Sequence, residues 1–369
     1  MKKRLLSLVL LSALLGQLLS GCAAGVTESA PPSAEPSVPA ASEPAETQPA
    51  ESQPPSAQPA QPGPVTVTDQ AGRTVTLEKP AEKIVSCYYL VTASLLTLGQ
   101  KDKLVGIEMK ASSRELYKLA APEFLDLPGV GSGKETNIEA IAALEPDLVL
   151  LPKKQLEAAE TLAGLGIPSA VVEPETYEAF NELLAMLGAL CGCEDAAAEL
   201  TAYYDGVADR VTALTKDADK PSVYLCGEAS WLRACTGGMY QREMIDMAGG
   251  TCVSAELEGT KWADVSAEQL AAWDPEVIFS VSYAEYALDD IRNDAALAGV
   301  KAVAGEKLYT VPSEIEAWDY PQPSSILGLL WMAHILHPDL VTQEEYVKEA
   351  QEFYQIYFGL KVTEDQLGI

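Results

Sequence analysis

The sequence predicts an α/β protein with two Rossmann-like lobes, each built on a largely parallel sheet and joined to the other by a long α-helix. Three observations lead to this prediction. Short β-rich runs alternate with helical patterns, the alternation occurs in two series, and a segment of helical pattern separates the series. Alternating strands and helices are typical of parallel sheets that helices cover on both faces. The 369-residue length suits two such units, at ~150 residues per domain.

The first lobe is predicted over residues 65–175. It begins with a β-hairpin, because VTVTDQAGRTVTLE (65–78) alternates around a turn that contains Gly72. Strands and helices then follow in turn. The strands are expected at 83–86, 103–107, 147–151 and 168–172, and the helices near 90–98, 137–144 and 154–165.

A connecting segment (176–217) and the second lobe (218–369) complete the predicted fold. The connecting segment is helical in pattern with one break near Gly192. A helix from about Asp195 to Thr215 would span ~30 Å, enough to bridge two lobes. Strands of the second lobe are expected at 222–226, 276–282 and 307–311, and helices near 241–248, 266–273 and 324–336.

One pattern occurs in both lobes. NIEAIAALEPDLVL (137–150) and SAEQLAAWDPEVIF (266–279) share the spacing of a Glu, two alanines, a Pro between two acidic residues, and an apolar run. Pro146 and Pro275 are expected to end a helix, because the ring removes a backbone donor and restricts the preceding residue. The repeat therefore predicts a duplicated helix–strand unit.

The N-terminal residues predict export and a lipid anchor. Residues 1–21 combine a basic start, a 15-residue apolar run and small residues, which is typical of a signal peptide. The ending Leu19-Ser20-Gly21-Cys22 resembles the lipobox of bacterial lipoproteins, which implies cleavage before Cys22 and lipid on its sulfur. An uncleaved membrane anchor is the alternative. Residues 22–64, rich in Pro, Ala, Ser, Glu and Gln, predict a disordered tether.

Composition excludes some partners and sites. The formal net charge of −29 argues against nucleic acid or an anionic surface as partner. Six further cysteines lie mostly in apolar strand or helix patterns, which predicts buried thiols, with disulfides as the alternative in an exported protein. These residues are Cys87, Cys191, Cys193, Cys226, Cys235 and Cys252. Their spacing does not match a zinc site.

Catalytic motifs are absent from the sequence. The two histidines, His334 and His337, lie in one amphipathic pattern, where a helix face is expected rather than a metal site or a catalytic triad. PGVGSGKETN (128–137) has Pro128 and Glu135 where a phosphate-binding loop needs Gly and Ser or Thr. We therefore expect no enzyme activity, no catalytic residue, no bound metal and no cofactor.

The chain resembles the binding proteins of vitamin B12 and ferric-siderophore ABC importers over about residues 65–360. Four stretches carry this resemblance: VTDQAGRTVTLEKPAEKIVS, TLGQKDKLVGI, NIEAIAALEPDLVLL, and VPSEIEAWDYPQP followed by GLLWMAHILHPD. The resemblance implies that the connecting helix is rigid, that the ligand lies in the cleft between the lobes, and that the lobes hinge little.

The resemblance also gives the repeated Glu a role. It implies that Glu139 and Glu268 pair with arginines of the two permease subunits, one from each lobe. Helix capping is the alternative, since Thr136-x-x-Glu139 and Ser266-x-x-Gln269 both fit a capping box. In the second copy Gln269 completes the box, so capping does not require Glu268.

The expected ligand-binding residues lie in loops that follow strands, because ligands of open α/β sheets bind beyond the carboxyl ends of the strands. Aromatic faces and a few cations in these loops suit a bulky, partly apolar ligand, with the cations available to any anionic group on it. The residues after strands are Tyr88, Tyr89, Lys110, Lys153, Trp231, Arg233, Tyr283, Trp318 and Tyr320, and the loops before the repeated helices add Lys134, Lys261 and Trp262.

Together these patterns predict a lipid-anchored, extracytoplasmic substrate-binding protein of a bacterial ABC importer. It is expected to act as a monomer that captures a ferric siderophore, haem or cobalamin and delivers it to a permease dimer with its ATPase subunits. Two alternatives stay open: a tethered extracellular hydrolase on a two-lobe scaffold, and a binder of a bare metal ion or oxyanion.

Overall fold

The described chain begins with a β-hairpin that is fastened to the first sheet. A computed structural model describes residues 63–132, 134–312 and 314–369, so the predicted signal peptide, Cys22 and nearly all of the predicted tether lie outside it. Strands β1 (Val65–Thr68) and β2 (Thr74–Leu77) pair antiparallel, as expected. Asp69 holds the turn, since its Oδ1 accepts from the backbone of Arg73 at 2.8 Å and its Oδ2 accepts from Val171 at 2.9 Å.

The first lobe contains a parallel four-stranded sheet in the order β4-β3-β5-β6. Its strands are β3 (Ile84–Ser86), β4 (Leu104–Gly106), β5 (Leu148–Pro152) and β6 (Ser169–Val172), each within a predicted strand or one residue beyond it. Alternate residues face opposite sides: Ile84 and Leu148 join one core cluster, whereas Val85 and Val149 join another. Both faces of this sheet are therefore apolar, as a helix-covered parallel sheet requires.

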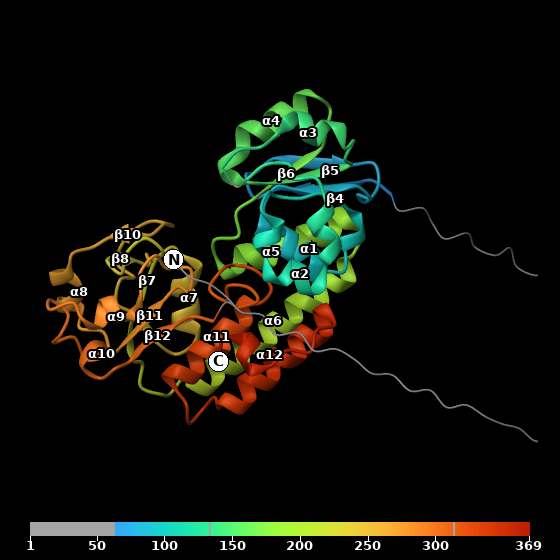
Figure 1. Ribbon diagram of the computed structural model, residues 1–369. Coiled ribbons are helices and arrows are strands. Elements are labelled where there is room, and N and C mark those ends of the chain that lie inside the picture. The colour runs from blue at the N-terminus through green and yellow to red at the C-terminus, as the bar shows by residue number, and fades with distance from the viewer. Residues whose placement is uncertain (1–62, 133, 313) are drawn as a thin grey trace, which may run out of the picture. The chain divides into compact units, whose positions relative to one another are not determined.

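Helices cover both faces of the first sheet (Figure 1). Helices α3 (Ile138–Ala143) and α4 (Leu156–Gly164) lie on one face, and α1 (Tyr89–Thr97) and α2 (Glu115–Ala120) lie on the other. Four short 3₁₀ turns lie in the connections, at Lys101–Lys103, Ala111–Ser113, Pro122–Asp126 and Lys153–Gln155. The turn at Ala111–Ser113 brings the chain back from β4 to the start of α2.

The second lobe has a mixed sheet in the order β10-β8-β7-β11-β12, with β9 also paired to β7. The predicted strands are present as β7 (Ser222–Cys226), β11 (Val277–Ser280) and β12 (Leu308–Thr310), and they are parallel. The sequence did not predict the two-residue strands β8 (Arg233–Ala234), β9 (Thr251–Cys252) and β10 (Ala263–Asp264), of which β8 and β10 are antiparallel.

The second sheet also has helices on both faces. Leu270, Ile291 and Val303 bring α8 (Ala267–Trp273), α9 (Leu288–Arg292) and α10 (Lys301–Ala304) into one core cluster with Tyr224 and Ile278 of the sheet. The opposite sheet face belongs to the main core, together with α7 (Tyr240–Met247) and α11 (Ser325–Leu336). Helices α12 (Gln343–Phe358) and α13 (Glu364–Leu367) end the chain.

The predicted connecting segment forms two helices, α5 (Tyr177–Cys191) and α6 (Glu194–Thr215). Gly192 ends α5 in the left-handed conformation, with φ of 66°, which explains the predicted break. The main apolar core includes residues of both sheets and of α1, α5, α6, α11 and α12. All described residues also belong to one compact unit. This shared core favours lobes that move little relative to each other.

The repeated pattern has the same backbone in both lobes. Helices α3 and α8 end before Pro146 and Pro275, and the residue before each Pro, Glu145 or Asp274, has a positive φ of 48° or 47°. The acid after each Pro then binds the backbone at the start of a central strand, β3 in the first lobe and β7 in the second. Asp147 accepts from the backbone of Lys83 at 2.9 Å, and Glu276 accepts from the backbone of Ser222 at 2.9 Å. The repeat is thus a structural duplication.

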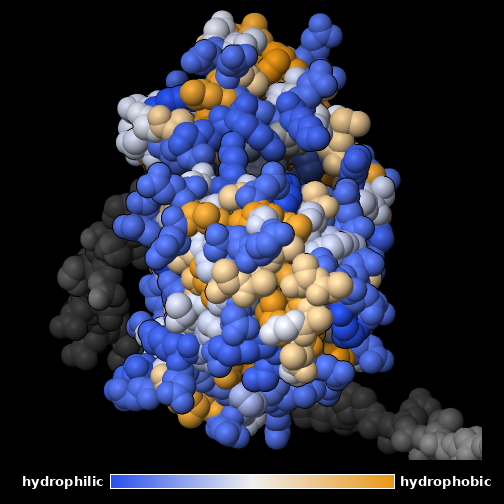
Figure 2. Space-filling model, turned by 90° about the vertical axis from the view of Figure 1, so that its left-hand side faces the viewer, coloured by the Kyte–Doolittle hydropathy of each residue, from blue (hydrophilic) through white to orange (hydrophobic). Residues whose placement is uncertain are grey.

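The cysteines and histidines of the described residues have structural surroundings. All six cysteines beyond Cys22 are free thiols, and each except the half-buried Cys193 is buried. His334 and His337 bond the backbone oxygens of Val341 and Gly249. Within the described ranges, no helix is long and apolar enough to cross a membrane. Figure 2 shows a largely hydrophilic face with some apolar side chains near its middle, which agrees with the high charge of the chain.

Candidate functional site

A cavity of about 240 Å³ lies where the two lobes meet. Loops and helices that follow β3, β4, β11 and β12 line it, so the cavity is at the carboxyl ends of strands from both sheets. The lobes touch directly here, because the backbone N–H of Leu116 donates to the carbonyl of Ile315 at 3.2 Å. The aromatic, charged and hydroxyl-bearing side chains of its lining include those of Tyr89, Ser113, Arg114, Glu115, Tyr117, Ser282, Tyr283, Glu314, Glu316 and Tyr320.

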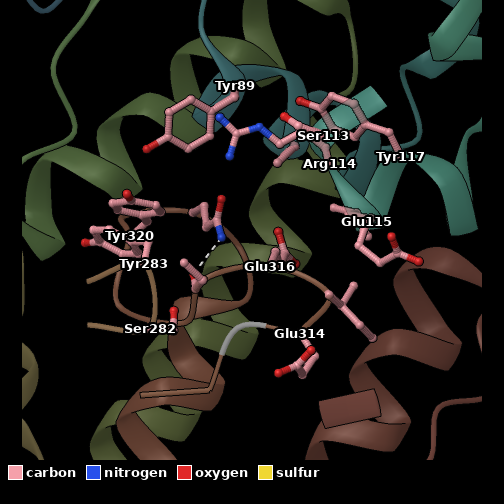
Figure 3. A pocket seen from close by; sticks show the side chains of 15 residues that line it. Tyr89, Ser113, Arg114, Glu115, Tyr117, Ser282, Tyr283, Glu314, Glu316 and Tyr320 are labelled. Atoms are coloured by element: carbon pink, nitrogen blue, oxygen red, sulfur yellow. Dashed lines mark hydrogen bonds between the residues drawn. The ribbon is translucent and has the colours of Figure 1, made fainter. Parts of the chain in front are cut away.

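Three tyrosines form one wall of the cavity (Figure 3). The rings of Tyr283 and Tyr320 are stacked, with centroids 4.8 Å apart and planes inclined by 20°. Tyr89, from the other lobe, meets Tyr320 edge to face at 5.5 Å. Tyr88 lies behind it, 5.3 Å from Tyr89. Together they present an aromatic surface to which a flat or apolar ligand face can bind.

A buried carboxylate fixes the tyrosine wall from behind. The hydroxyl of Tyr283 donates to Oδ2 of Asp319 at 2.7 Å. Asp319 is fully buried, and its Oδ1 has no hydrogen-bond partner among the described residues. Burial raises the pKa of this carboxyl from 3.8 to about 6, although the bond from Tyr283 opposes the change. The carboxyl of Asp319 therefore holds the aromatic wall through one oxygen, while its other oxygen is buried without a hydrogen bond.

Arg114 supplies the positive charge of the cavity. It precedes α2, and its guanidinium carbon lies 4.0 Å from the centre of the Tyr89 ring. Beneath it, Glu108 accepts from Thr92 at 2.7 Å and from Tyr117 at 2.8 Å. Burial raises the pKa of Glu108, and these two hydrogen bonds oppose the change. Glu108 is therefore satisfied within the protein, whereas Arg114 forms no ion pair or side-chain hydrogen bond among the described residues.

Glu316 faces Arg114 from the second lobe (Figure 3). Its Oε1 is shielded from solvent and has no hydrogen-bond partner in the described part of the chain, and the same holds for Oγ of Ser282. Burial raises the pKa of Glu316 from 4.5 to about 7, while hydrogen bonding with Ser324 and the charge of Arg114 oppose the change. Among the described residues, the cavity thus contains a cation without an ion pair, and a carboxylate oxygen and a hydroxyl that are shielded from solvent and have no hydrogen-bond partner.

The predicted ligand residues separate into two groups. Tyr89, Tyr283 and Tyr320 line the cavity, and Tyr88 packs against it. The other eight do not line it. Three of these residues are exposed lysines, Lys110, Lys134 and Lys261. Two others form ion pairs: Lys153 with Glu173, and Arg233 with Asp264 at 3.4 Å. The three tryptophans contact other parts of the protein, since Trp231 packs on Tyr286, Trp262 packs over Gly227 and Trp318 is buried.

Trp318, which was predicted to contact the ligand, lies in the core next to the cavity loop. Its side chain is only 1% exposed, and its indole N–H donates to the hydroxyl of Tyr354 at 3.1 Å. The residue follows β12 as predicted, but it points into the core that joins the segment after β12 to α12. Its role is to support the loop that carries Glu316 and Asp319.

Several site residues were missed by sequence reasoning. Arg114 lies eight residues after β4 ends at Gly106, beyond the Lys110 that the prediction selected. Glu314 and Glu316 stand in VPSEIEAWDYPQP, where the prediction selected the aromatic residues alone. Ser282 precedes Tyr283 directly. The signal that was available is the alternation of acids with apolar residues in a loop that follows a strand.

The two repeated glutamates have equivalent positions. Glu139 and Glu268 are both exposed in the first turn of α3 and α8. In α3 the N-cap is Asn137, whose side chain accepts from Ala140 at 3.0 Å, so the expected capping box of Thr136 and Glu139 is wrong. In α8 the N-cap is Ser266, which accepts from Gln269 at 3.1 Å, as expected. In each helix the cap is made by another residue than the glutamate.

Comparison with known proteins relates the chain to extracytoplasmic binding proteins. Residues 84–315 match the family described as periplasmic binding protein. The molybdate-binding protein MolA of Haemophilus influenzae is 24% identical over 335 residues, which cover 81% of this chain and 92% of that protein. A cobalamin-binding protein of Halobacterium salinarum is 28% identical over 230 residues, which cover 58% of this chain and 58% of that protein.

Solved structures share the fold. A periplasmic solute binding protein from Veillonella parvula superposes with a TM-score of 0.71 at 24% identity, covering 83% of this chain and 96% of that one. The structure of MolA bound to molybdate superposes with a TM-score of 0.68 at 22% identity, and the match covers 81% of this chain and 99% of MolA. The structure of Helicobacter pylori CeuE in a Ni-His complex superposes with a TM-score of 0.70 at 19% identity, and the match covers 83% of this chain and 98% of CeuE.

Proposed function

The chain belongs to the periplasmic binding protein family, whose members are transport proteins that bind a substrate for an ABC importer, and we propose that it captures an iron chelate, haem or corrinoid in the cavity between its lobes. Such proteins work with a cognate permease and ATPase, and the relatives described above are binding proteins rather than enzymes. The observation that carries the proposal is the aromatic cavity at the carboxyl ends of strands from both lobes.

The size and lining of the cavity support a chelate with an apolar face. Its volume of about 240 Å³ lies below the ~300–1,000 Å³ of pockets that enclose drug-sized ligands. A small chelate would fill it, and a corrinoid or haem would place one edge on the tyrosines while the rest lies outside. One arginine beside several carboxylates gives little support to the oxyanion alternative, and the described residues contain no group of three or more His, Cys, Asp or Glu positioned to hold a bare metal ion.

Two further parts of the proposal concern the membrane. Cys22 would carry the lipid anchor, as the lipobox-like ending suggests, and a curated relative in Bacillus subtilis is named a substrate-binding lipoprotein. Replacing Cys22 by Ala should abolish metabolic labelling with fatty acid, and unchanged labelling would contradict the anchor. Glu139 and Glu268 would contact the two permease subunits, because they are exposed at equivalent positions of duplicated units and a two-fold partner presents equivalent sites.

A ligand panel tests the proposed function. Cobalamin, haem, ferric citrate, several ferric siderophores and molybdate are titrated into the purified protein, and binding is followed by calorimetry and by tryptophan fluorescence. Trp318 adjoins the cavity loop, so occupancy should change its emission. We expect saturable one-to-one binding of at least one metal chelate. Absence of binding to every chelate would contradict the proposal.

A further inference from the structure

The cavity presents opposed polar groups that the protein leaves without partners. From the first lobe, Arg114 enters with its guanidinium over Tyr89 and without an ion pair among the described residues. From the second lobe come Glu316, whose Oε1 has no hydrogen-bond partner in the described part of the chain, and Ser282, whose Oγ has none either. Figure 3 shows Arg114 and Glu316 on different sides of the cavity. The charge of Arg114 opposes the raised pKa of Glu316, and the two groups form no ion pair among the described residues.

An unpaired buried polar atom needs a physical explanation. Leaving such an atom without a partner costs free energy, and natural proteins contain few of them. Elsewhere near the cavity the protein does satisfy a buried carboxylate, because Glu108 accepts from both Thr92 and Tyr117. The contrast between Glu108 and Glu316 indicates that the second carboxylate is left open for a group from outside the chain.

The chemistry of each open group restricts that outside group. Glu316 is acceptor-only when ionised, so it requires a hydrogen-bond donor or a positive charge. Arg114 has only donors, so it requires an acceptor or a negative charge. Of the other carboxylates of the lining, Glu115 pairs with Lys118 at 2.8 Å, and Glu314 is exposed to solvent. A pure acceptor such as an oxyanion would satisfy Arg114 and oppose Glu316.

We propose, on the basis of the proposed function, that the cavity selects a dipolar ligand. One end of this ligand accepts hydrogen bonds from Arg114, the other end donates to Glu316 and Ser282, and its apolar face lies on the wall formed by Tyr89, Tyr283 and Tyr320. Metal chelates of amino acids have this chemistry through their amine and carboxylate groups. The carboxamide side chains of a corrinoid have it as well, since each amide both donates and accepts.

Calorimetric titration of three probes tests the proposal on the parent protein. Molybdate only accepts hydrogen bonds at neutral pH, whereas the nickel–histidine chelate and cobalamin both donate and accept. We expect at least one of the two dipolar probes to bind about tenfold more tightly than molybdate, because only they satisfy both charged groups. Molybdate binding as tightly as the tighter dipolar probe would overturn the inference.

Variants of the two charged groups extend the test. Glu316→Gln keeps the size of the side chain and removes its charge, so it should weaken the tighter dipolar probe about tenfold and leave molybdate binding equal or stronger. Arg114→Gln should weaken both kinds of probe. Glu123→Gln, at an exposed carboxylate outside the cavity that pairs with Lys101 at 2.6 Å, is the matched control and should change each affinity by less than about twofold. Melting temperatures verify that each variant folds, and Arg114→Lys substitutes if Arg114→Gln does not.

The outcomes separate this inference from the proposed function. If the parent binds a chelate and Glu316→Gln weakens it no more than Glu123→Gln does, the proposed function stands and the dipolar selection is wrong. If Glu316→Gln strengthens every probe, the carboxylate opposes the ligand and the selection is again wrong. If the parent binds none of the chelates, both the proposed function and the inference fail.

Discussion

The buried carboxyl of Glu316 should make the stability of the ligand-free protein depend on pH near neutrality. Its pKa is about 7 in the folded protein because burial disfavours the charged form, against 4.5 for an unperturbed Glu. Since the folded chain binds this proton more tightly than the unfolded chain, the stabilisation is complete below about pH 4.5 and is lost as the pH rises through about 7. The difference between 4.5 and about 7 corresponds to about 3 kcal/mol of unfolding free energy.

Glu316→Gln removes this titration while it keeps the shape of the side chain. Thermal unfolding of the variant and the parent, at several pH values from about 4.5 to about 8.5, gives the difference in melting temperature. At the alkaline end the variant should melt higher by ~5 °C, which is ~3 kcal/mol for a folded body of this length. At the acid end the two proteins should melt together. Glu115→Gln is the control, since that carboxylate pairs with Lys118 and is about half exposed.

The sign and the pH dependence of the difference in melting temperature test whether the pKa of Glu316 is raised. A melting temperature that differs from that of the parent by the same amount at all pH values would refute the raised pKa of Glu316. The difference would then come from packing alone. A variant that is less stable at alkaline pH would show that the carboxylate is satisfied in the folded protein. Either result would also remove the main support for an open acceptor in the cavity.

Three further predictions concern other parts of the molecule. Trp318→Ala should lower the unfolding free energy by ~3–5 kcal/mol, because a large buried side chain and its hydrogen bond to Tyr354 are lost. Unfolding in urea measures this change, and a loss below ~1 kcal/mol would show that Trp318 is not a core residue. Tyr283→Ala should weaken the ligand found in the panel by ~1–3 kcal/mol in calorimetry, whereas unchanged affinity would move the site away from the tyrosine wall. Replacing Glu139 and Glu268 together by Gln should reduce uptake into permease vesicles while ligand affinity and melting temperature stay nearly constant, and normal uptake would reject the docking role.

The fold was predictable because its elements are long enough to show a period. Strands such as β3 and β5 lie within one residue of the expected ranges, since both of their faces are apolar and helical patterns flank them. Helix α6 ends at Thr215 as expected. The strands β8, β9 and β10 have two residues each, and two residues carry no period. The N-cap at Asn137 was missed because Thr136 beside it has an equally good capping side chain.

A residue of the site was predictable only where it directly follows a strand or the turn after that strand. Tyr89 and Tyr283 were found in this way, because their position is set by the carboxyl end of β3 or β11. Arg114 was missed because a 3₁₀ turn and a left-handed residue at Lys110 carry the chain back toward the cavity, and neither has a sequence period. Trp262 was predicted as a ligand residue but does not line this cavity, because its ring lies against Gly227. Loop direction depends on tertiary contacts that a single sequence does not display.

Hydrogen exchange of the protein with and without the tightest ligand of the panel tests whether the ligand binds between the two lobes. We expect bound ligand to slow exchange in residues 113–117, 282–284 and 314–322, which contribute to the cavity from both lobes. Simultaneous protection of segments from both lobes is expected only for a ligand held between them. Protection limited to one lobe, or to the groove that Leu214, Leu330 and Val341 line on α6, α11 and the loop before α12, would contradict the account.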